Sequence, residues 1–148
     1  MTEGVRSDPA LDAAAISVVI PAHRADEGFR ACLASVAACR PPMGEVIVVA
    51  DGEAPGCAAI AAEWGARALV TAGGEGPAIA RNLGAREASG ALILFLDADV
   101  VVPGDLMGHV ARLFAQEPGL DGVFGSYDAA PAAAGAVSVF RNLLHHHV

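Results

Sequence analysis

Two aspartates directly follow the most apolar run of the chain. Residues 91–96 carry no charge, and Asp97 and Asp99 come next. In an extended chain, residues two apart point the same way, so we expect both carboxylates to face one point at a strand end. Two close like charges repel unless a cation lies between them. Because hard oxygen ligands suit Mg²⁺ and Mn²⁺, which also bind diphosphates, the pair predicts a divalent-cation site. The alternative is a turn in which one aspartate caps the next helix.

A third aspartate, Asp51, ends another apolar run, residues 46–50, and Gly52 follows it. Asp-Gly is a favoured pair in tight turns, which is one interpretation. The other is a carboxylate that accepts a hydrogen bond from a nucleobase or a ribose. The residues alone leave both interpretations open.

A glycine-rich segment, residues 73–76, precedes a predicted helix. Backbone N–H groups and the positive end of the helix dipole favour phosphate there. The segment is neither a Walker A loop nor a Gly-x-Gly-x-x-Gly fingerprint, so a plain flexible loop is equally consistent with it. One turn inside the helix, Arg81 is expected to contact a phosphate, Asp97 or Asp99, or to lie on a solvated helix face.

Short apolar strands and amphipathic helices alternate along the chain. The pattern predicts strands over residues 16–20, 46–50, 68–71, 91–96 and 120–125, and helices over 28–39, 57–64, 77–88 and 104–116. Such alternation predicts an α/β fold with a mostly parallel sheet, in which ligands bind beyond the carboxyl ends of the strands. Because residues 91–96 are apolar throughout, we expect that strand to be central.

Composition narrows the class of protein. The length of 148 residues favours one domain, which we place at residues 15–148 after a flexible leader at 1–14. A net charge of −8 without a basic cluster disfavours nucleic acid as a partner. No apolar run is long enough for a membrane span. The 3 cysteines lack metal or disulfide spacing. They indicate a reducing compartment, so we expect a cytoplasmic protein, either free or at the inner face of the membrane.

Four motifs in order resemble the family 2 glycosyltransferases of the GT-A fold. They are Ser-Val-Val-Ile-Pro-Ala (17–22), Val-Ile-Val-Val-Ala-Asp-Gly (46–52), Gly-Pro-Ala-Ile-Ala-Arg-Asn-Leu-Gly (76–84) and Ala-Ser-Gly-Ala-Leu-Ile-Leu-Phe-Leu-Asp-Ala-Asp (88–99). The resemblance implies a Rossmann-like GT-A domain. It also implies transfer of a sugar from a nucleotide-diphosphate sugar to an acceptor, with inversion and with help from a metal ion.

The resemblance also implies roles for single residues. The donor nucleotide site would comprise Pro21, Ala22, Asp51, Gly76, Arg81, Asn82 and Asp97. Asp97 and Asp99 would hold Mn²⁺ or Mg²⁺ at the diphosphate, and Asp51 would bind the pyrimidine or ribose. A UDP-sugar is favoured over a GDP-sugar. The family's usual Tyr-Asn after the first strand is replaced here by His23 and Arg24, which puts the identity of the nucleotide in doubt.

The family keeps its acceptor site and its catalytic base in a later segment, so we interpret the chain as the donor-binding part of a larger enzyme. We expect the isolated chain to self-associate and to lack transfer activity. Within it, Asp128 is the only plausible substitute for the base. The adjacent histidines 145–147 lie on different helix faces and do not form a ready metal site. They are either a tag remnant or the native continuation of a helix.

Two other functions are weighed against this interpretation. A non-catalytic nucleotide-binding module would share the donor site without transferring sugar. Leu-Phe-Leu-Asp-Ala-Asp (94–99) also resembles the first motif of haloacid-dehalogenase-type phosphatases, with Asp97 as nucleophile and Asp99 as acid and base. That phosphatase family needs a downstream lysine, and this chain contains none.

Overall fold

The computed structural model describes residues 11–52, 54 and 56–126. The chain divides into two units, residues 1–118 and 119–148. All helices and strands of the described residues belong to the first unit. The prediction of a strand at residues 120–125 is wrong, because this segment forms no strand and pairs with no strand of the sheet. An apolar run forms a strand only when a neighbouring strand satisfies its backbone hydrogen-bonding groups. Here even the apolar side chain of Phe124 is fully exposed.

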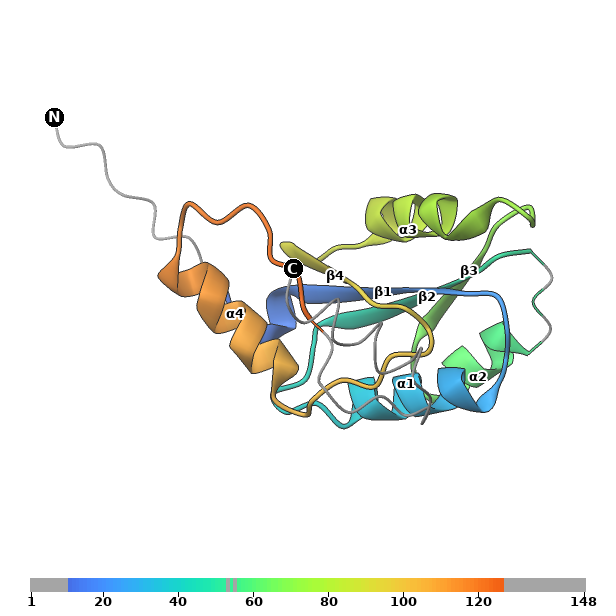
Figure 1. Ribbon diagram of the computed structural model, residues 1–148, viewed down its shortest axis with the longest axis horizontal. Coiled ribbons are helices and arrows are strands. Elements are labelled where there is room, and N and C mark those ends of the chain that lie inside the picture. The colour runs from blue at the N-terminus through green and yellow to red at the C-terminus, as the bar shows by residue number, and fades with distance from the viewer. Residues whose placement is uncertain (1–10, 53, 55, 127–148) are drawn as a thin grey trace, which may run out of the picture. The chain divides into compact units, whose positions relative to one another are not determined.

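Four parallel strands form one sheet in the order β3-β2-β1-β4 (Figure 1). Their bounds are β1 Ile16–Ala22, β2 Glu45–Ala50, β3 Arg67–Val70 and β4 Leu92–Phe95. Helices alternate with the strands along the chain. The α/β prediction with a mostly parallel sheet is therefore confirmed.

The central strand is β1, and the expectation that residues 91–96 are central is wrong for the described sheet. All seven residues of β1 are buried, whereas β4 is an edge strand with alternating exposure. The first strand also extends past its expected end and includes Pro21, which pairs in register with Val49. Pairing of β1 with β4 stops at Val19. Because Pro21 lies beyond that pairing, its missing N–H leaves no gap in the ladder between β1 and β4.

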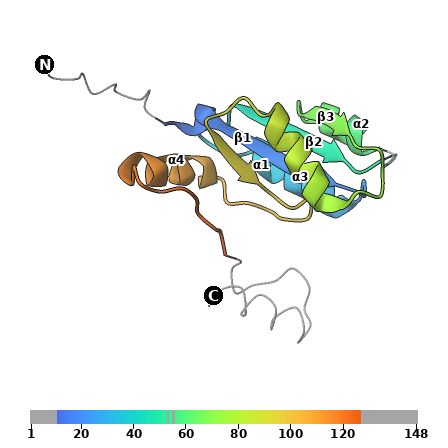
Figure 2. The same ribbon diagram turned by 90° about the horizontal axis from the view of Figure 1, so that it is seen from above.

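Helices cover both faces of the sheet. Helices α1 (Glu27–Ala37) and α2 (Cys57–Glu63) pack on one face and α3 (Gly76–Glu87) packs on the other (Figures 1 and 2). Alternation along β1 explains this layering. Val18 and Ile20 belong to the core with α1 and α2, and Val19 packs with Ala80 of α3. Helix α4 (Leu106–Gln116) and a short 3-10 helix, η1 (Ala13–Ala15), complete the unit.

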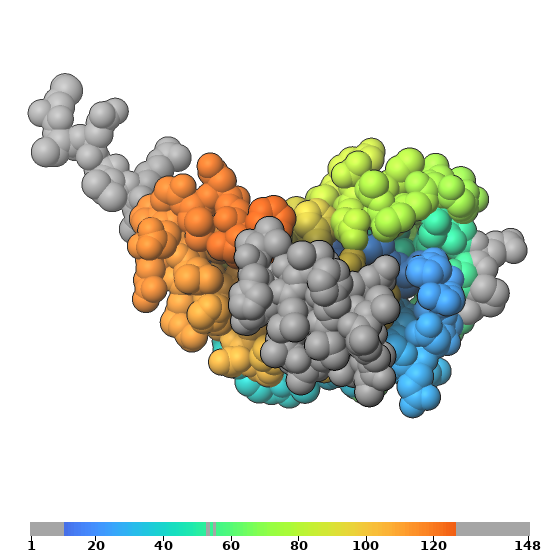
Figure 3. Space-filling view, viewed as in Figure 1, coloured from blue at the N-terminus to red at the C-terminus, as the bar shows by residue number. Residues whose placement is uncertain are grey.

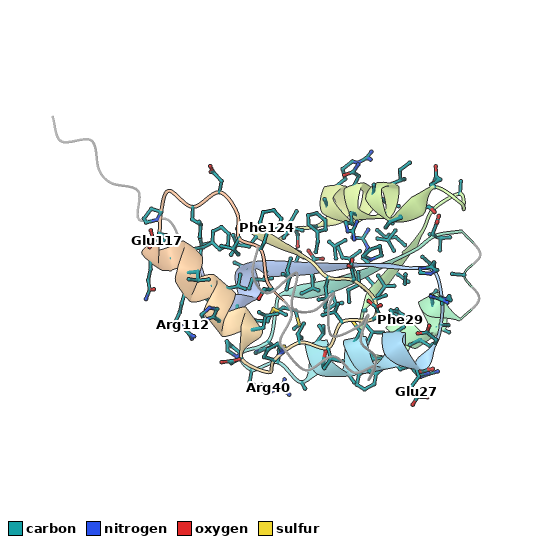
Figure 4. The ribbon with its side chains drawn as sticks, in the orientation of Figure 1. Glu27, Phe29, Arg40, Arg112, Glu117 and Phe124 are labelled. Carbon is teal, nitrogen blue, oxygen red and sulfur yellow. The ribbon has the colours of Figure 1, made fainter. Side chains whose placement is uncertain are left out.

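The helix predicted over residues 28–39 is confirmed as α1, which ends two residues earlier, at Ala37. The carboxylate of Asp26 accepts a hydrogen bond of 3.0 Å from the Phe29 N–H, which satisfies a donor at the helix start. Phe29, Cys32, Leu33 and Val36 form one buried stripe. In Figure 4, Phe29 lies on this helix and the exposed Glu27 lies in its first turn. Burial of a side chain the size of Phe29 stabilises the fold by about 1.5–3 kcal/mol.

A polar cluster ties the amino ends of the strands together. Glu45 Oε1 accepts hydrogen bonds from Ser17 Oγ at 2.6 Å, Ser89 N at 2.6 Å and Ser89 Oγ at 2.8 Å. The Ser17 hydroxyl also accepts from Gly90 N at 2.8 Å. These donors stabilise the carboxylate and lower the pKa of Glu45 to about 2. The cluster joins β1, β2 and the turn before β4, and no sequence motif predicted it.

The boundary between leader and domain remains a prediction. Residues 1–10 lie outside the described residues. Ala13, within the expected leader, is buried in the core. Among the described residues, no helix combines the length and the apolar character needed to cross a membrane.

Candidate functional site

A cleft of about 520 Å³ lies beyond the carboxyl ends of β1, β2 and β4. Its lining comes from residues that follow these strands and from the start of α3: Pro21, Ala22, His23, Arg24, Asp26, Asp51, Pro77, Ala80, Arg81, Asp97, Ala98 and Asp99. Figure 3 shows the surface hollowed between the yellow-green atoms of α3 and the blue atoms at the connection from β1 to α1. The cleft therefore lies where the alternation of strands and helices predicts a ligand site, beyond the carboxyl ends of the strands.

Asp97 and Asp99 both line this cleft, but a turn brings them there and not an extended strand. Strand β4 ends at Phe95, and the Val100 N–H donates to the Asp97 carbonyl at 3.1 Å. The expectation that strand alternation aligns the two carboxylates is therefore wrong in its geometry. Neither aspartate caps the next helix, because the residue before α4 is Asp105.

Helix α1 holds the segment that contains these aspartates. The Cys32 thiol donates to the Asp97 carbonyl at 3.6 Å, and Ser35 Oγ accepts from Val102 N at 3.1 Å. The Cys39 thiol donates to the Pro103 carbonyl at 3.6 Å. Burial, together with the negative charge of Asp99, raises the pKa of Cys32 to about 12, so the thiol stays protonated as a donor. Cys32 on α1 and Cys39, two residues after the end of that helix, are thus buried residues that also position the segment after β4.

Arg81 and Asp97 form an ion pair across the cleft. Arg81 Nη2 lies 2.6 Å from Asp97 Oδ1. The Arg81 side chain is 35% exposed and that of Asp97 is 51% exposed, so solvent screens the pair. The expected contact between Arg81 and an aspartate after β4 is confirmed for Asp97.

Both oxygens of Asp51 accept hydrogen bonds. Oδ1 accepts from Thr71 Oγ1 at 2.8 Å and from Glu75 N at 3.2 Å, and Oδ2 accepts from Gly76 N at 3.1 Å. These contacts, led by the Thr71 hydroxyl and the Gly76 N–H, lower the pKa of Asp51. Asp51 therefore fastens the glycine-rich segment to the end of β2 while its side chain lines the cleft.

Thr71, directly after β3, is a part of the site that no sequence motif predicted. Its hydroxyl also accepts from Gly52 N at 3.1 Å and from Gly73 N at 3.3 Å. A Cβ on Gly52, whose φ is +71°, would lie 2.6 Å from Gly73 Cα, so the two loops approach as only glycine permits. The only sequence signal was a polar residue closing a short apolar run.

The other predicted site residues divide into two groups. Pro21 and Ala22 line the cleft, as the motif order implied. Gly76 contacts Asp51 but is not in the lining, and Asn82 is exposed outside it. The lining also contains Asp26 and Pro77, which the sequence did not assign to the site. Asp128 and histidines 145–147 lie outside the described residues.

The donor set suits a shared cation site. Within the part of the chain that the structure describes, no group of three or more His, Cys, Asp or Glu side chains could hold a metal ion by itself. Asp97 and Asp99 offer hard oxygen ligands in one cleft. Mg²⁺ is commonly bound by one or two carboxylates together with phosphate oxygens of a ligand, and two aspartates fit that pattern.

Comparison with known protein families identifies the chain. Residues 17–137 match the family described as "Glycosyl transferase family 2". The chain belongs to glycosyl transferase family 2. The matched residues include the whole lining of the cleft. They also include all four strands of the described sheet, apart from the first residue of β1, Ile16. The resemblance drawn from the four motifs is therefore confirmed.

Solved glycosyltransferase structures share the fold of this family 2 chain. S. aureus TarS 1–349 in complex with UDP has a TM-score of 0.65 at 20% identity. The alignment covers 80% of this chain and 39% of the TarS chain. Mannosyltransferase PcManGT from Pyrobaculum calidifontis, in complex with GDP-Man and Mn²⁺, has a TM-score of 0.60 at 19% identity. The alignment covers 93% of this chain and 42% of the PcManGT chain. These likenesses support the GT-A fold.

A third structure is glucosyl-3-phosphoglycerate synthase from Mycobacterium tuberculosis in complex with Mn²⁺, UDP and phosphoglyceric acid. It has a TM-score of 0.53 at 24% identity, with 73% of this chain and 40% of that chain covered. The family 2 chain spans well under half of the length of each of these structures. No curated protein sequence matches it.

Proposed function

We propose that the chain binds a nucleotide-diphosphate sugar in the cleft and serves as the donor-binding part of an inverting glycosyltransferase. The observation that carries the proposal is the meeting of Asp51, Arg81, Asp97 and Asp99 in one cleft at the carboxyl ends of parallel strands. Membership of glycosyl transferase family 2 supports sugar transfer as the reaction.

The proposed donor is a UDP-sugar, with a GDP-sugar as the alternative. Similar solved structures contain bound UDP, UDP-GlcNAc or GDP-Man. Asp51 would accept a hydrogen bond from the base or the ribose, and Pro21 and Ala22 would lie under the nucleoside. Gly76, Arg81 and Asn82 would lie beside the phosphates, and Arg81 is already in the cleft.

Asp97 and Asp99 would hold Mn²⁺ or Mg²⁺ together with the diphosphate. A bound divalent cation neutralises charge on a leaving diphosphate. Arg81 would exchange its partner, Asp97, for a phosphate oxygen, because a guanidinium binds either group well. Two similar structures contain Mn²⁺, which supports the choice of metal.

In the proposed displacement, an acceptor hydroxyl oxygen forms a bond to the anomeric carbon as the bond from that carbon to the diphosphate breaks. Attack opposite the leaving group inverts the configuration. The hydroxyl proton passes to a base, a role that we assign to none of the described residues. The residues of this chain contribute donor orientation and charge stabilisation at the leaving group.

Calorimetric titration with UDP, with and without Mn²⁺, tests the proposal. The parent should bind UDP in Mn²⁺ and bind it much more weakly in EDTA. A double Asp97→Asn and Asp99→Asn variant should lose roughly tenfold or more of the affinity in Mn²⁺, since charged ligands to the metal are gone. Equal binding by parent and variant would exclude the cation site.

Asp105→Asn provides the matched control. It makes the same chemical change at an exposed aspartate outside the cleft lining. This variant should bind UDP and Mn²⁺ as the parent does. A similar loss in the control would attribute the effect to overall charge and not to the site.

A further inference from the structure

We infer that Thr71 is a positioning residue for nucleotide binding, which acts by holding the carboxylate of Asp51 in its ligand-accepting orientation. This inference rests on the proposed function and deepens it. Thr71 itself is not in the lining of the cleft, whereas Asp51 is. Its influence on a ligand would therefore pass through Asp51.

The contacts of Asp51 leave it little rotational freedom. Three donors bind its two oxygens: Thr71 Oγ1, directly after β3, and Glu75 N at Oδ1, and Gly76 N, at the start of α3, at Oδ2. A carboxylate has about four acceptor positions, so these contacts leave one on Oδ2 for a donor group of a ligand. A nucleoside offers such donors in its ribose hydroxyls or base N–H groups.

The Thr71 hydroxyl is itself fixed in orientation. A hydroxyl has one proton to donate and two lone pairs. Here the proton goes to Asp51 Oδ1, and the lone pairs accept from Gly52 N and Gly73 N. Thr71 is only 9% exposed, so water does not readily replace these bonds. Rotation of the hydroxyl would break three contacts at once.

The chain also offers a matched hydroxyl at the other end of the sheet. Ser89 Oγ donates to Glu45 Oε1 at 2.8 Å, the same length as the bond from Thr71 to Asp51. Ser89 and Glu45 are not in the lining of the cleft. Loss of the Ser89 hydroxyl therefore removes a bond of the same kind with no route to the ligand.

The experiment compares Thr71→Val, Thr71→Ser and Ser89→Ala with the parent in calorimetric titrations with UDP in Mn²⁺ and with UMP in EDTA. Thr71→Val should weaken binding of both nucleotides by roughly three- to tenfold, the range for loss of one hydrogen bond. The loss should be the same with and without metal, because Asp51 is not a metal ligand in the proposal. Thr71→Ser, which keeps the hydroxyl, should bind like the parent. Ser89→Ala should lower the melting temperature without changing either affinity.

Each contrary outcome is distinct. A folded Thr71→Val that binds both nucleotides as the parent does would overturn the inference, and so would equal losses in Thr71→Val and Thr71→Ser. If Thr71→Val does not fold, Thr71→Cys gives the same comparison, since a thiol is a weaker donor. Absence of UDP binding by the parent would overturn the proposed function itself, and that result is read before any variant is made.

Discussion

At the scale of single residues, the cleft contains aspartates in two different environments. Asp51 is bound by neutral donors from a hydroxyl and two backbone N–H groups, which lower its pKa. Asp97 is bound by the guanidinium of Arg81. Neutral donors orient a carboxylate and leave its charge in place, whereas Arg81 also compensates the charge. In the proposed function, this difference fits Asp97 to a role beside a cation and Asp51 to recognition of the nucleoside.

Arg81→Gln tests the second of these environments. Because both side chains of the ion pair are partly exposed, loss of the pair should lower the free energy of unfolding by less than about 1 kcal/mol. Affinity for UDP in Mn²⁺ should fall more clearly, through the lost phosphate contact. Urea denaturation measures the first quantity and calorimetry the second. A large loss of stability with unchanged UDP affinity would make Arg81 a structural residue only.

At the scale of elements, α3 depends on small residues to reach the sheet. Ala80 is fully buried, and Gly84 faces β1 and β2. A Cβ added at Gly84 would overlap Val19 Cγ1 and lie 3.2 Å from Val49 Cγ2. The close approach brings the start of α3, with Pro77 and Arg81, to the cleft.

Gly84→Ala should therefore destabilise the fold, although alanine is the better helix former. The overpacking cost of typically 1–3 kcal/mol exceeds the helix-propensity gain of about 1 kcal/mol. Thermal unfolding measures the difference. Gly104→Ala is the control, since a Cβ there meets no atom within 4 Å. A Gly84→Ala variant as stable as the parent would show that α3 shifts at little cost.

The Glu45 cluster gives a second prediction at this scale, a dependence of stability on pH. The pKa of Glu45 is about 2, below its ordinary 4.5, so the carboxylate contributes stability in full above pH 4.5 and loses it as pH falls toward 2. Glu45→Gln should remove this part of the pH dependence and lower stability at neutral pH. Urea denaturation over this pH range compares the parent with Glu45→Gln and with Glu117→Gln, an exposed site outside the cluster. Parallel curves for all three would contradict the assignment.

At the scale of the whole molecule, one side of the described sheet stays partly uncovered. Phe95 is in register with Val19 and so lies on the face that α3 covers, yet it is 46% exposed. Ile93 on the same face is 40% exposed. Edge strands with apolar side chains tend to pair with other chains.

Self-association of the isolated chain is the prediction that follows. Sedimentation velocity over a concentration series should show oligomers for the parent, and Ile93→Thr with Phe95→Thr should shift the distribution toward monomer. Trp64→Thr, which removes an exposed aromatic at the end of α2, should leave the parent's distribution unchanged. A monomeric parent at every concentration would exclude the edge of β4 as an association surface.

Local sequence signals were enough for most elements and for the place of the site. A helix was predicted over residues 28–39, and α1 spans Glu27–Ala37. Asp51, Asp97 and Asp99 were predicted to lie beyond the carboxyl ends of parallel strands, and this needed only the alternation of strands and helices along the chain. The spacing of apolar residues and the signals at helix ends depend only on neighbouring residues, so both can be recognised without knowledge of the fold.

Only the tertiary structure decided which contacts these residues make. The turn at Asp97, the edge position of β4 and the missing strand at 120–125 all depend on pairing between distant segments. Thr71 joins Asp51 across 20 positions of the chain. An isolated polar residue after a weak strand carries no periodic signal. Its role exists only because parallel strands bring their carboxyl ends together, where one hydroxyl can serve three partners.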